Sequence, residues 1–128
     1  MNYMWVALGA ALGGMFRYWC YGAAARLIGE TFPWGTLVVN VAGSAFIGWF
    51  ATLTGPEGRT LAPVSMRLFV MTGICGGYTT FSTFSLETLR LMQDGEWTQA
   101  GANIAASLIL CLGGVWAGHA TAVWMNQR

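Results

Sequence analysis

The sequence predicts an all-α integral membrane protein with four transmembrane helices, forming a single domain over residues 1–128. Of the residues, 55% are hydrophobic and only 9% are charged, a composition typical of membrane proteins. A bilayer core of about 30 Å needs roughly 20 helical residues. Four apolar segments qualify, at residues 3–28, 34–53, 68–92 and 100–124.

The first segment, residues 3–28, follows an N-terminus without a basic region and is too long for a cleavable signal, so we expect it to be retained. Arg17 is the one charge well inside it. A mid-membrane arginine costs roughly 2.5–3.5 kcal/mol on insertion scales, so Arg17 should reach the interface, pair with a polar group or face a polar cavity. An anchor at the interface and a place in a polar vestibule fit the sequence equally well.

The second segment, residues 34–53, carries no charged residue, and its most informative side chain is Asn40. The amide group offers two N–H donors and a carbonyl oxygen. Buried Asn in membranes commonly forms an interhelical hydrogen bond. The alternative is a donor that lines a pore, and this segment alone leaves both open.

The third segment, residues 68–92, is expected to break at Gly76 and Gly77, which precede a run of threonines and serines. An unpaired backbone group in hydrocarbon costs several kcal/mol, so a break is tolerated only where the freed groups face protein, water or an ion. A non-helical turn also gathers carbonyl oxygens, which suit hard cations such as Na⁺.

Beyond the expected break, helical spacing puts Phe81 and Phe84 on one face, framed by hydroxyls. The stripe beside the rings contains Thr80, Thr83 and Glu87, and the other flank contains Thr79 and Ser82. Aromatic edges carry partial positive charge and hydroxyls can donate, so this face could accept a small anion without a fixed cation. The two rings could equally face lipid or the protein core.

The fourth segment, residues 100–124, has no Asp, Glu, Lys or Arg, and His119 near its end is the only histidine. No carboxylate or cysteine shows triad or metal spacing around it, so the sequence does not predict an enzyme. The three cysteines lie singly in apolar segments, which favours packing over a disulfide or a metal site.

The arginines divide almost evenly between the two expected sides of the membrane, and the chain has no lysine. The side of the termini carries Arg59, Arg67 and Arg128, and the other side carries Arg26 and Arg90. Such a balance permits insertion in both orientations. Because four short helices cannot enclose both a water path and a packed core, a transport function requires a second copy, and an antiparallel homodimer is expected.

Three motifs, in three of the four segments, together strongly resemble the Fluc/CrcB family of microbial fluoride ion channels. They are Gly-(x3)-Gly-(x3)-Arg at residues 9–17, Gly-Thr-Leu-Val-Val-Asn-(x2)-Gly at residues 35–43, and Gly-(x2)-Gly-Gly-x-Thr-Thr-Phe-Ser-Thr-Phe-Ser-x-Glu at residues 73–87. The whole chain length fits as well.

The resemblance implies a dual-topology antiparallel homodimer in the bacterial inner membrane, with two pathways that passively export cytoplasmic fluoride. It implies a structural Na⁺ at the dimer interface, held by the backbone carbonyls of Gly76 and Thr79. The implied fluoride pathway comprises Arg17, Asn40, Phe81, Ser82, Thr83, Phe84, Ser107 and Glu87. The expected partners are fluoride, a second copy and membrane lipid, and no nucleic acid.

A small multidrug-type proton-coupled exporter is the alternative, since it shares the size, the four spans and the dual topology. Such an exporter relies on an acidic residue within its first segment. Residues 3–28 contain none.

Overall fold

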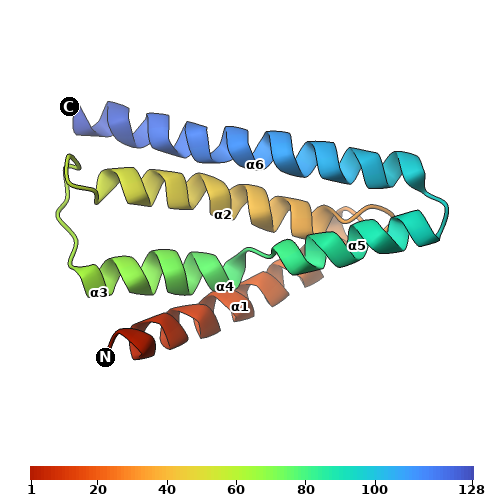
Figure 1. Ribbon diagram of the computed structural model, residues 1–128, viewed down its shortest axis with the longest axis horizontal. Coiled ribbons are helices and arrows are strands. Elements are labelled where there is room, and N and C mark those ends of the chain that lie inside the picture. The colour runs from red at the N-terminus through yellow and green to blue at the C-terminus, as the bar shows by residue number, and fades with distance from the viewer.

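The computed structural model describes residues 1–128 as an elongated bundle of helices without strands (Figure 1). Three long helices are continuous: α1 (Asn2–Leu27), α2 (Trp34–Leu53) and α6 (Trp97–Asn126). The remaining segment is divided into α3 (Val64–Arg67), η1 (Leu68–Cys75), α4 (Gly76–Tyr78) and α5 (Phe81–Gln93). The expected all-helical architecture is confirmed, and α2 has the bounds that the sequence predicts.

Both termini lie at one end of the bundle, together with the loop at residues 54–63 (Figure 1). The loops at residues 28–33 and 94–96 lie at the opposite end, so successive long segments run in opposite directions. α2 and α6 are each long and apolar enough to cross a membrane, with a mean hydropathy of 1.6.

Small residues let the helices approach closely within the chain. α1 packs against η1 and α4, and α2 packs against α6. A Cβ atom built on Gly73 would lie 2.8 Å from Gly9 Cα, so neither position has room for a side chain. The glycine pairs of α1 and η1–α4 therefore serve packing inside one protomer, as tight helix contacts of this type do.

The predicted break at Gly76 and Gly77 is wrong, because both glycines are helical and the interruption lies at Thr79 and Thr80. Thr79 (φ −82°, ψ 158°) and Thr80 (φ −153°, ψ 115°) are extended. Gly77 is required for packing: a Cβ there would lie 2.8 Å from Ala10 Cα. Thr79 and Thr80 therefore precede α5 and do not belong to its helical stripe, whereas Phe81 and Phe84 lie in its first turn.

The start of α5 explains where the chain turns back into a helix. The Thr80 hydroxyl oxygen accepts the Thr83 backbone N–H at 3.1 Å, which is the bond of an N-cap residue. The turns before the break, Leu68–Cys75, are π-helical, a form the sequence did not predict and one that is common near functional sites. A capping threonine thus starts α5 after the break, and the π-helical residues are followed by α4 before it.

Candidate functional site

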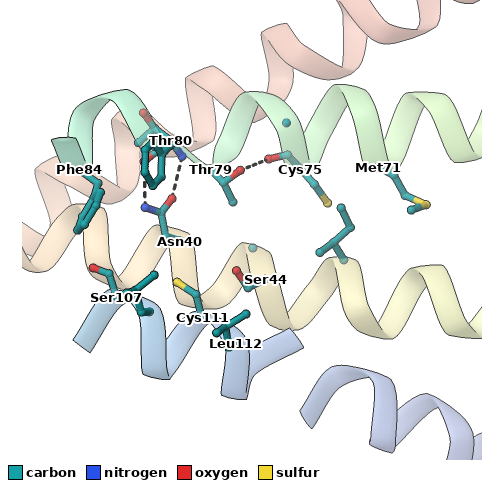
Figure 2. A pocket seen from close by; sticks show the side chains of 15 residues that line it. Asn40, Ser44, Met71, Cys75, Thr79, Thr80, Phe84, Ser107, Cys111 and Leu112 are labelled. Atoms are coloured by element: carbon teal, nitrogen blue, oxygen red, sulfur yellow. Dashed lines mark hydrogen bonds between the residues drawn. The ribbon is translucent and has the colours of Figure 1, made fainter. Parts of the chain in front are cut away.

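The side chain of Asn40 joins α2 to the break by two hydrogen bonds, drawn in Figure 2. Asn40 Nδ2 donates to the Thr80 carbonyl oxygen (3.0 Å), and the Thr80 N–H donates to Asn40 Oδ1 (2.7 Å). Of the two alternatives that the sequence leaves open, the interhelical hydrogen bond is therefore present. One N–H of the amide remains uncommitted, so Asn40 can still offer a donor to a ligand.

The break deprives Gly76 and Thr79 of their usual helical donors. In a continuous α-helix the Gly76 carbonyl would accept the Thr80 N–H, and the Thr79 carbonyl would accept the Thr83 N–H. These N–H groups donate to Asn40 and to the Thr80 hydroxyl instead. Backbone carbonyls freed in this way are the hard oxygen ligands that alkali and alkaline-earth cations take, so the residues present fit the expected Na⁺.

Arg17 reaches the same break from α1. Its Nη1 donates to the Thr79 carbonyl oxygen at 3.2 Å, and the side chain is half-buried. This is the only hydrogen bond of the Arg17 side chain, and its partner is a neutral carbonyl. Of the three options given by the sequence, the structure shows pairing with a polar group.

A groove of about 360 Å³ lies between α2, the segment from η1 to α5, and α6 (Figure 2). Six of the ten residues implied by the resemblance line it: Asn40, Gly76, Thr79, Phe81, Phe84 and Ser107. The two phenylalanine rings are neighbours, with centroids 5.4 Å apart and planes inclined at 46°. Phe81 is 76% exposed in the protomer, so its ring is available to whatever occupies the groove.

Ser82 and Thr83 meet at the hydroxyl of Thr80 and do not line the groove. Thr80 Oγ1 lies 3.2 Å from Ser82 Oγ and donates to Thr83 Oγ1 at 3.0 Å. Thr80 is buried and holds this group together. The sequence analysis put Thr80 on the hydroxyl stripe beside the rings, but the resemblance did not include it in the fluoride pathway.

Glu87 lies in a second cavity of about 390 Å³, near the end of the bundle opposite the termini. Thr36 Oγ1 donates to Glu87 Oε1 (2.8 Å) and lies 3.3 Å from Tyr21 Oη, while Glu87 Oε2 is buried without a partner. The sequence analysis did not include Thr36 or Tyr21 in the fluoride pathway. Thr36 could have been found, because it precedes Asn40 by one helical turn and shares its face of α2.

Ser107, on α6, is buried and completes the far wall of the groove. Its Oγ lies 3.5 Å from Asn103 Oδ1, and Asn103 Nδ2 donates to Thr88 Oγ1 of α5 at 3.0 Å. Asn103 and Thr88 were not predicted. His119 lies apart from this network, with Nδ1 2.7 Å from Thr52 Oγ1.

Comparison with known proteins identifies the family. The family described as "CrcB-like protein, Camphor Resistance (CrcB)" matches residues 4–119. A protein of Opitutus terrae named "Fluoride-specific ion channel FluC" is 59% identical over 125 residues, 98% of this chain and 95% of the relative. Proteins of the same name from Rhodospirillum rubrum and Methylocella silvestris are 56% and 55% identical over 127 residues, 99% of this chain and 98% and 97% of the relatives.

The relatives are named as channels and not as enzymes, which agrees with the sequence prediction. Membership of a channel family and the apolar helices α2 and α6 make the chain a membrane protein. The resemblance inferred from the three motifs is confirmed: this chain belongs to the CrcB family.

Proposed function

We propose that this protein is a fluoride-selective channel that lets cytoplasmic fluoride leave the cell passively. The observation that carries the proposal is the position of the Asn40 amide, which is fixed to Thr80 in a groove that also contains Phe81 and Phe84. The name shared by relatives that cover nearly the whole chain supports fluoride as the ion.

The chemistry of the groove suits a small, strongly hydrated anion. Conduction requires donors that replace water stepwise and hold the ion weakly enough to let it leave. The groove offers ring edges, a spare amide N–H and hydroxyls, all of them neutral. A narrow path through such groups would exclude larger anions.

The expected residues of α5 connect the cavity with the groove. Glu87 lies with Thr36 of α2 in the cavity at one end, Phe81 and Phe84 border the groove, and Ser82 and Thr83 lie between the two phenylalanines in the sequence. We propose that fluoride passes between the cavity and the groove along these hydroxyls. Ser107 would complete the path on α6.

A second copy of the chain would complete the site. The groove is open in the protomer, and Phe81 projects from it with most of its surface uncovered. We propose an antiparallel homodimer with four spans per protomer and two pathways, inserted in both orientations in the bacterial inner membrane. Two inverted breaks would then present the Gly76 and Thr79 carbonyls of both protomers to one structural Na⁺, whose positive charge would satisfy these oxygens.

Purified protein in liposomes tests the function directly. We expect rapid electrogenic efflux of fluoride, measured with a fluoride electrode, and no comparable efflux of chloride. Proton-dependent uptake of organic cations without fluoride efflux would instead support the small multidrug-type exporter. Labelling of tagged termini on intact cells and on inverted vesicles should find both ends on both sides of the membrane, and a single orientation would contradict dual topology.

A further inference from the structure

The Arg17 guanidinium is a charged group that hydrogen-bonds at the break but does not line the groove. Conduction requires that an ion be held weakly enough to leave again. The only hydrogen bond of this side chain goes to the Thr79 carbonyl oxygen. That oxygen is one of the two carbonyl oxygens of each protomer that are proposed to bind Na⁺, so the guanidinium and Na⁺ would compete for one ligand atom.

We propose that Arg17 competes with Na⁺ for the Thr79 carbonyl and thereby lowers the Na⁺ affinity of the dimer. This inference rests on the Na⁺ site proposed above. Arg17 supplies a donor in place of the one that the helix break takes away from the Thr79 carbonyl. An unsatisfied carbonyl at membrane depth would be costly, so Arg17 allows the protomer to form its break before it dimerises.

The backbone of α1 packs directly against the segment before the break. Gly13, one turn before Arg17, lies so close that a Cβ there would be 2.8 Å from Tyr78 N. The flexible side chain of Arg17 is therefore the part of α1 that we expect to move. When Na⁺ binds, the guanidinium must leave the oxygen or remain near the ion at a cost.

The size of the effect follows from Coulomb's law. Two unit positive charges about 5 Å apart, at an effective dielectric near 20, change a binding constant by roughly 250-fold. The side chain can relax outward, which reduces this figure. We therefore expect removal of the charge to tighten Na⁺ binding by about tenfold or more.

The test compares two neutral variants with a charged one. Arg17→Met and Arg17→Gln remove the charge, and Arg17→Lys keeps it. Arg26→Met is the matched control, because Arg26 lies nine residues later on α1 and makes no hydrogen bond to the break. The measurement is the fraction of purified dimer, determined by cross-linking in detergent, as Na⁺ is titrated against a K⁺ background.

We expect the Na⁺ midpoint of both neutral variants to fall by about tenfold or more, while those of Arg17→Lys and Arg26→Met stay within about threefold of wild type. An unchanged or raised midpoint in the neutral variants would overturn the inference. So would their failure to assemble at saturating Na⁺, because the ion should then replace Arg17 at the oxygen. If the fraction of wild-type dimer does not depend on Na⁺, the proposed Na⁺ site is wrong. If it does depend on Na⁺ but the midpoints of the neutral variants do not shift, only the proposed role of Arg17 is wrong.

Discussion

Replacing Asn40 by Ala tests whether this side chain holds the helix break together. The change removes both hydrogen bonds to Thr80 and leaves a backbone N–H and a C=O without partners. Each buried unsatisfied group costs about 1–3 kcal/mol, so the free energy of unfolding should fall by about 2–6 kcal/mol. An ordinary interhelical hydrogen bond in a membrane contributes only about 0.6 kcal/mol on average, so the two cases are separable.

The assay is unfolding of the purified protein in detergent, read alongside fluoride efflux from liposomes. Ser44→Ala is the control, because Ser44 follows Asn40 by one turn, lines the same groove and has no hydrogen bond to the break. It should change stability by less than about 0.5 kcal/mol. If Asn40→Ala is as stable as this control, Asn40 does not hold the break; if it is also inactive, its amide acts on the ion alone.

Three further predictions concern the rings, the cation and the packing. Phe81→Ile or Phe84→Ile keeps the bulk of the side chain but removes the ring quadrupole, so fluoride efflux should fall at least tenfold while the dimer stays folded. The control Leu53→Ile should have little effect on efflux. Full efflux in both Phe variants would mean that the rings serve packing only. Removal of Na⁺ by prolonged dialysis should lower activity or dimer stability in a way that K⁺ does not restore, as measured by efflux and cross-linking. Gly73→Ala should destabilise the fold by roughly 1–3 kcal/mol in detergent unfolding, because its Cβ would lie 2.8 Å from Gly9 Cα, whereas Gly101→Ala, which meets open space, should not.

Hydropathy was sufficient to find the helices, because each expected segment must be apolar over the thickness of the bilayer core. α2 begins at Trp34 and ends at Leu53, as predicted, since a proline precedes it and a polar, glycine-containing loop follows it. The position of the break could not be found in this way. It depends on a pair of residues 40 positions apart, Asn40 and Thr80, whose contact exists only after α2 has packed beside the third segment.

The glycines misled the prediction for a physical reason. Gly weakens an isolated helix, so Gly76-Gly77 is the natural place to expect an interruption. In the structure Gly77 instead gives α1 room for close contact, and the helix continues to Tyr78. A local cost in helix propensity is thus outweighed by tertiary packing.

The candidate site came mainly from the resemblance, and the structure shows why spacing alone was insufficient. Periodicity grouped Glu87 with the phenylalanines, yet Glu87 lines a different cavity and bonds to Thr36 of α2. Periodicity also cannot show that Arg17 of α1 ends at the Thr79 carbonyl. Both contacts join residues more than 50 positions apart.

The break is stabilised by the same polar groups that the proposed channel would offer to an ion, and this limits how they could bind fluoride. One N–H and the oxygen of the Asn40 amide are already hydrogen-bonded to Thr80, and the Thr80 hydroxyl donates to Thr83. Each side chain therefore has little hydrogen-bonding capacity left for a ligand. These residues could not bind an anion through several hydrogen bonds at once unless the break were lost. Each of them can contribute about one donor, which favours weak binding at successive sites over tight binding at one site. Weak binding at successive sites is the condition for conduction.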